Sequence, residues 1–76
     1  MRLMKVTSLS QLDTSKEYLA YIRYEQGEDQ HMYIGLAHLY ASGQAWNAYM
    51  AMNNTIWDTP IDSTDTTIQQ FCIELD

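Results

Sequence analysis

The chain has 76 residues, of which 46% are hydrophobic and 12% aromatic, and its formal net charge at pH 7 is −6. We expect one compact domain, 1–76, because the length suits a single core and the apolar content is too high for a disordered chain. A single cysteine, Cys72, excludes an internal disulfide and favours a reducing compartment. We therefore expect a cytoplasmic protein, in the host cytoplasm if the chain is phage-encoded.

The N-terminal third of the chain predicts one or two strands. Side chains in 3–9 alternate along the chain, as in a short strand at an edge. The segment 16–26 is ambiguous, because Leu19, Ile22 and Arg23 also suit one face of a helix. The preference of tyrosine and isoleucine for strands favours a strand here. Its alternating residues are Tyr18, Ala20, Ile22 and Tyr24.

The centre of the chain, 29–53, predicts a helical hairpin. In 29–42, five large side chains fall within an arc of about 120° on a helix. Gly43 stands where a helix-ending glycine is typical, and most apolar residues of 45–52 gather on one side of a second helix. The alternative is a pair of β-hairpins that turn at 26–29 and 53–54. The five side chains are Met32, Tyr33, Leu36, Leu39 and Tyr40.

The C-terminal part begins with a connector, 55–67, that is rich in threonine and aspartate around Pro60. The apolar residues of 66–75 fit a helical face or a strand face equally well, so the type of this element stays open. The predicted fold class is α+β, a small single domain with N-terminal strand(s), a central helical hairpin and a C-terminal strand or helix. The alternatives are all-β hairpins or an all-α fold.

The charges are segregated along the chain. The first 23 residues hold all four basic side chains and two acids, a balance of +2, whereas the remaining 53 residues hold eight acids and no lysine or arginine. These acids lie at 25–29 and 58–76, on either side of an uncharged block, 30–57. Direct binding to nucleic acid or to an anionic membrane is therefore disfavoured, because both partners attract clustered positive charge.

The sequence predicts no enzyme, no cofactor and no metal site. On a helix, His31 and His38 would share a face but would be separated by about 10.5 Å of rise, too far to bind one ion. Cys72 lies on the apolar seam of the last element and is predicted to be a small core residue. The three glycines are too scattered to form a phosphate-binding loop.

We predict that the acids and a tryptophan form a partner-binding surface. If 58–65 were helical, Asp58, Asp62 and Asp65 would align about 5–6 Å apart and imitate a row of phosphates. The alternative is a solvated acidic loop. Tryptophan suits an interface anchor because its ring is large and amphipathic. The predicted surface consists of Glu28, Asp29, Trp57, Asp58, Asp62, Asp65, Glu74 and Asp76.

These features predict a small acidic inhibitor that binds another protein. A net charge of −6 steers a chain toward a partner with a basic surface, and clefts that hold DNA or RNA are such surfaces. The sharper hypothesis is a nucleic-acid mimic that blocks the basic site of a nuclease or a CRISPR-type defence complex. In size and charge the chain resembles small acidic phage proteins of this class, the anti-CRISPR proteins. The alternative is a structural or accessory subunit that forms a homodimer or larger assembly through an aromatic patch.

Overall fold

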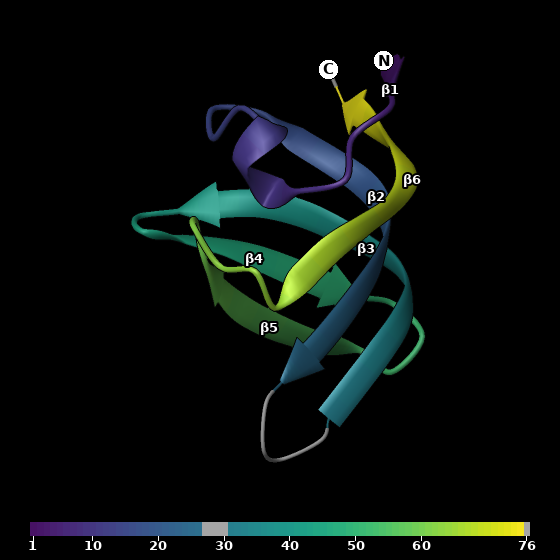
Figure 1. The fold of residues 1–76 in the computed structure, drawn as a ribbon, viewed down its shortest axis with the longest axis vertical. Helices are drawn as coiled ribbons and strands as arrows, with labels where there is room; N and C mark the ends of the chain where they lie inside the picture. The colour runs from purple at the N-terminus through teal and green to yellow at the C-terminus, as the bar shows by residue number, and fades with distance from the viewer. Residues whose placement is uncertain (27–30, 76) are drawn as a thin grey trace.

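The computed structural model describes residues 1–26 and 31–75, which form a single antiparallel sheet and one short 3-10 helix (Figure 1). Across the sheet the strands run in the order β1-β6-β2-β3-β4-β5. The elements in chain order are β1 (Arg2–Met4), η1 (Leu9–Gln11), β2 (Glu17–Gln26), β3 (His31–Ser42), β4 (Ala45–Met50), β5 (Thr55–Pro60) and β6 (Thr66–Leu75).

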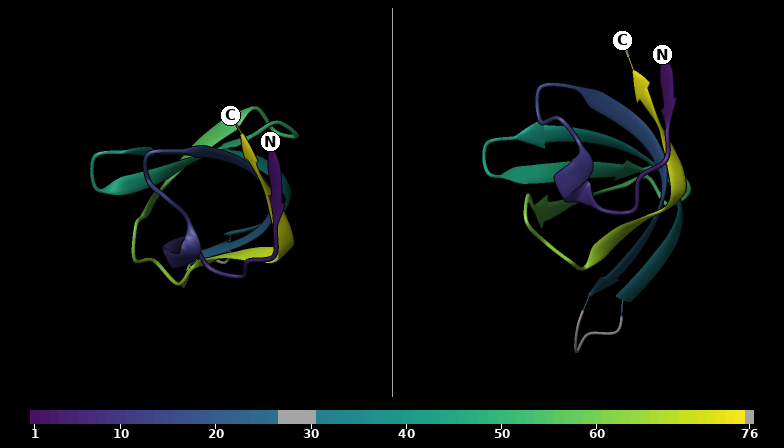
Figure 2. Two further views of the ribbon diagram at one scale, coloured as in Figure 1. Left: turned by 90° about the horizontal axis from the view of Figure 1, so that it is seen from above. Right: turned by 45° about the horizontal axis from the view of Figure 1, so that its top comes forward.

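The sheet curls into a barrel-like shape. Strands β2 to β5 form a meander, and β6 returns to pair with the other side of β2. Seen from above, the strands follow a ring (Figure 2). The hydroxyl of Thr66 on β6 donates to that of Thr59 on β5 across 3.4 Å, so β5, at one edge of the sheet, approaches β6 inside the curled sheet. A register shift between Ala20 and Ile22, opposite the positive φ of Gln70, bends β2 and β6 together.

The core lies on the concave face of this sheet. Trp46 and Tyr18 are fully buried there and meet edge to face, with ring centroids 6.0 Å apart. Leu9 of η1 adds to this core, and the Gln11 side chain holds η1 in place by accepting from the backbone N–H groups ahead of it. The largest fully buried side chains are Trp46, Tyr18, Leu9, Ile22, Leu39, Met50 and Cys72.

The predicted helical hairpin at 29–53 is wrong, and with it the α+β class: the described chain is nearly all β. The reason is that 32–42 is apolar on both faces of a strand, a pattern that also fills a wide helical arc. Leu39 faces the core, whereas Leu36 faces outward and is 54% exposed. Gly43, with φ +62°, makes the tight turn between β3 and β4 instead of ending a helix.

The other elements are strands or turns. Segment 16–26 contains the strand β2, and 66–75 is the strand β6 instead of a helix. The predicted strand at 3–9 is reduced to β1, and part of the rest becomes η1. The observed hairpins agree with the all-β alternative, since β2 ends at Gln26, β3 begins at His31, and the turn between β4 and β5 occupies 51–54. No helix within 1–26 and 31–75 is long and apolar enough to span a membrane.

Two methionines test the strand assignment. Met50, at the end of β4, is completely buried, whereas Met52, in the turn that follows, is 82% exposed. We expect Met50→Ala to lower the free energy of unfolding by about 2–5 kcal/mol and Met52→Ala to change it by less than about 0.5 kcal/mol. Urea unfolding followed by tryptophan fluorescence measures both. Equal effects would contradict the fold.

Candidate functional site

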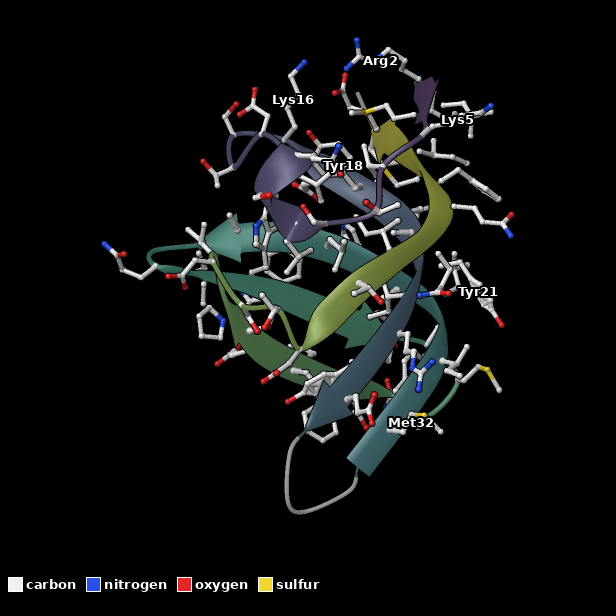
Figure 3. The ribbon with its side chains drawn as sticks, viewed as in Figure 1. Arg2, Lys5, Lys16, Tyr18, Tyr21 and Met32 are labelled. Atoms are coloured by element: carbon white, nitrogen blue, oxygen red, sulfur yellow. The ribbon has the colours of Figure 1, made fainter. Side chains whose placement is uncertain are left out.

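The basic side chains are largely paired with acids. Strand β6 lies between β1 and β2, which puts Glu74 opposite Arg2 and next to the start of β2. The Glu74 carboxylate is 3.2 Å from both Arg2 and Lys16, and its side chain is only 13% exposed. Arg2, Lys5 and Lys16 lie near the end of the molecule that carries both termini (Figure 3). Glu74, a predicted partner-binding residue, is therefore electrostatically compensated.

A second salt bridge lies where the acidic half of the chain begins. Arg23 and Glu25 project from the same face of β2, and their charged groups are 3.3 Å apart. Both side chains are well exposed, so the pair contributes little to stability. It does neutralise the Glu25 carboxylate. Of the four basic residues, only Lys5 forms no salt bridge within the described chain.

Three acids form what we call the acidic strip: Asp58, Asp62 and Asp65. All are exposed, and none makes an ion pair in the part of the chain that the structure describes. Asp58 lies on β5 opposite Asn47, and Asp62 lies in the turn after β5. Asp65 precedes β6, where its carbonyl accepts from the Glu25 N–H at 2.9 Å. The strip therefore retains its negative charge.

The acidic strip does not have the predicted helical alignment. Strand β5 continues through Pro60, and 61–65 contains turns and bends. Proline lacks the N–H group that a helix interior needs, and threonine and aspartate favour turns or extended backbone. The three carboxylates therefore follow the path of a strand and a connection, so they supply concentrated charge but not the regular spacing of a helix face.

Trp57 lies on the other face of β5 from Asp58. It is half-buried, packs against the core, and its ring centroid is 4.9 Å from that of Tyr24. Burial, and then the negative charge of Asp65, raises the pKa of Tyr24 above its usual value. Tyr24 therefore brings Trp57 and Asp65 to the same end of the barrel. The predicted residues Glu28, Asp29 and Asp76 lie outside the described residues.

Two open clefts flank these charges. One of about 530 Å³ adjoins the acidic strip and is lined by Arg23, Glu25, Thr64, Asp65 and Thr67. Because Arg23 already pairs with Glu25, the free carboxylate in this cleft is that of Asp65. It can accept a cationic side chain from a partner. The other cleft, of about 400 Å³, is lined by Ser15, Lys16, Glu17, His38, Glu74 and Leu75.

His38 and Cys72 were considered for metal binding and nucleophilic chemistry, and the structure places each of them in a different setting. His38 lies on a strand, so the helical comparison with His31 no longer applies, and its Nε2 is 2.7 Å from the Glu17 carboxylate. Within the described ranges, no three His, Cys, Asp or Glu side chains are placed to hold a metal. Cys72 is fully buried, and burial is the main cause that raises the pKa of its thiol.

An exposed apolar surface, which was not predicted from the sequence, covers part of the convex face. Tyr21 on β2 lies opposite Leu36 on β3, and Leu3 on β1 lies opposite Ile73 on β6. Figure 3 shows Tyr21 and Met32 on the outside of the sheet, with Tyr18 inside. Period-two alternation of apolar residues on both faces could have indicated it. The residues of this surface that are more than 40% exposed are Leu3, Tyr21, Met32, Ile34, Leu36 and Phe71.

Comparison with protein-family models, curated proteins and solved structures gave no match. The described chain presents two candidate surfaces: an uncompensated acidic strip beside an aromatic pair, and an exposed apolar convex face.

The buried thiol gives a direct test of the interior. Because its pKa is raised and its surface is covered, Cys72 should react with a maleimide far more slowly than a free thiol at neutral pH. We expect labelling to require unfolding, so urea should accelerate it over the same range in which tryptophan fluorescence changes. Mass spectrometry measures the labelled fraction. Rapid, complete labelling of the folded protein would show that β6 does not bury this residue.

Proposed function

We propose that the chain is a small acidic inhibitor that binds the basic nucleic-acid site of another protein, such as a nuclease or a CRISPR-type defence complex. The observation that supports this proposal is the acidic strip. Asp58, Asp62 and Asp65 carry three negative charges without an ion pair in the described chain, while Arg2, Lys16 and Arg23 pair with acids elsewhere.

Charge of this kind acts before contact. At physiological ionic strength, charges interact over about 8 Å, so a strip of unpaired carboxylates attracts a basic cleft during the approach. Carboxylates that already form a salt bridge with a lysine or arginine contribute much less to this attraction. The strip would therefore orient the molecule, with β5 and the β5–β6 connection facing the partner.

The contact needs apolar area as well as charge. Trp57 is half-buried and packs against the buried ring of Tyr24, which pairs with Thr66 next to Asp65, so its exposed part supplies a rigid aromatic surface at this end of the barrel. The cleft with the Asp65 carboxylate can receive one lysine or arginine of the partner. In this proposal the acids replace the charge of a nucleic-acid backbone, and the aromatic pair provides shape.

Assembly through an apolar surface is the second candidate function. The convex face favours it, because six of its apolar side chains are more than 40% exposed. This surface differs from the acidic strip in both chemistry and position, so the two functions do not exclude each other.

Neutralising the acidic strip tests the inhibitor proposal. We expect Asp58→Asn, Asp62→Asn and Asp65→Asn together to weaken binding at least about tenfold, a loss of about 1.4 kcal/mol, while the stability changes by less than about 0.5 kcal/mol because the side chains are exposed. Biolayer interferometry against a panel of purified nucleases and CRISPR effector complexes measures binding. Duplex DNA should compete with the wild-type protein for its target.

A charge-matched control separates contact from net charge. Asp13→Asn, Glu17→Gln and Glu74→Gln also remove three negative charges, but at acids that bond to Ser15, His38 and basic side chains. This control should keep most of the binding, and raising the salt concentration should weaken the wild-type complex. Equal losses in both triple variants would reject the strip as a contact, and no binding to any panel member would reject the proposal.

A further inference from the structure

Strand β3 has an unpaired edge. It spans twelve residues, but β4 pairs only with its second half, Ala37–Ser42. Residues 31–36 pair with β2 on one side and, in the described ranges, with no strand on the other. Figure 1 shows this half of β3 extending beyond β4 beside β2. We refer to residues 32–36 as the open edge.

The open edge lacks the features that protect the other sheet edges. Strand β1 has three residues and carries Arg2, and β5 carries Asp58 and Pro60. Short length, charge and proline all discourage pairing with another chain. The open edge reads Met-Tyr-Ile-Gly-Leu, without a charge or a proline. It is therefore the edge most suited to accept a further strand.

Local packing holds the open edge in an extended form. The Tyr33 ring lies over Gly35, where an added Cβ would be 2.8 Å from the tyrosine oxygen. The Tyr33 hydroxyl donates to the Leu36 carbonyl at 2.9 Å. An aromatic side chain over a glycine is a known way to stabilise a strand edge. The segment is thus ordered before any partner binds, which lowers the entropy cost of pairing.

We propose that the open edge pairs with the open edge of a second copy of this chain, antiparallel and about a two-fold axis at Ile34. In that register Ile34 faces Ile34 of the second copy, and Met32 faces its Leu36. On the opposite face, Tyr33 faces Gly35 of the second copy. Such an interface is self-complementary, as closed dimers require.

The side chains favour a second copy as the occupant. On the convex face Met32, Ile34 and Leu36 are 59%, 47% and 54% exposed. Pairing would place these six side chains from the two copies side by side, and cross-strand apolar pairs stabilise a sheet. Tyr21, opposite Leu36 on β2, would extend the apolar band in each copy. Every residue of the open edge therefore meets one of matching polarity.

The charges nearest the open edge do not oppose this pairing. Arg23 lies one strand inward, opposite Ile34. The two Arg23 residues would then be three strand spacings apart, about 14 Å. At physiological ionic strength, charges are largely screened beyond about 8 Å, so the two side chains would repel each other only weakly. Glu25, opposite Met32, would lie in one row with Tyr21 of the second copy. Five residues per copy form less than a standard interface of about 800 Å² per partner, so the dimer should dissociate on dilution.

Charge substitutions at the symmetry axis test the proposal. Ile34→Lys places two lysines directly opposite each other, and Ile34→Glu places two glutamates there, so each variant alone should be monomeric. A mixture of the two should form a heterodimer, because opposite charges now face each other. Sedimentation equilibrium over a range of concentrations measures the mass. The wild-type protein should change from monomer to dimer as its concentration rises.

Ile56→Lys is the matched control. Ile56 is a comparably exposed isoleucine, at 56%, but lies on β5, so its substitution should leave dimerisation unchanged. A second measurement uses the wild-type chain alone: hydrogen exchange at the amides of 32–36 should slow as concentration rises, while exchange on β5 stays constant. A wild-type protein that is monomeric at all soluble concentrations, or a dimer lost in Ile56→Lys but kept in Ile34→Lys, would overturn the proposal.

Discussion

The packing of Trp46 against Tyr18 is the interaction on which the rest of the structure depends. Both residues are fully buried, and their edge-to-face contact fills the centre of the curled sheet. Two other buried residues of β3 and β4, Ala37 and Ala48, are small. The Trp46 indole N–H has no hydrogen-bond partner among the described residues, which costs about 1–3 kcal/mol. The large apolar area of two buried aromatic rings offsets this cost.

The sheet curls because large aromatic rings fill its inside. This curl brings together charged residues that are far apart in the sequence. The return of β6 beside β1 and β2 brings Glu74 to Arg2 and Lys16. The connection before β6 keeps Asp62 and Asp65 away from these cations. The return of β6 thus neutralises the surface around Glu74 and leaves the acidic strip charged. The apolar open edge lies on β3, and in the strand order β4 separates β3 from β5, which carries Asp58.

Strand 16–26 could be predicted because only one of its faces is uniformly apolar. Tyr18, Ala20 and Ile22 are buried, and residues between them are charged or partly exposed. Strand β3 could not be predicted in this way, since Met32, Ile34 and Leu36 are apolar on the outer face while Ala37 and Leu39 are apolar on the inner face. A two-sided apolar strand and a helix with a wide apolar arc have nearly the same pattern. Among the predicted site residues, the acids of the strip could be located in the sequence, but the pairing of Glu74 with Arg2 and Lys16 could not be predicted from it.

The sequence by itself determined the separation of charge, the absence of an internal disulfide and the uncharged central block, because these depend only on which residues occur where. Tertiary structure alone decided which face of β3 is buried and which acids stay unpaired. The physical reason is distance along the chain. Arg2 and Glu74 are 72 residues apart, and Lys16 and Glu74 are 58 apart, so no local pattern records that they meet. The open edge has the same origin, since it exists only because β4 is shorter than β3.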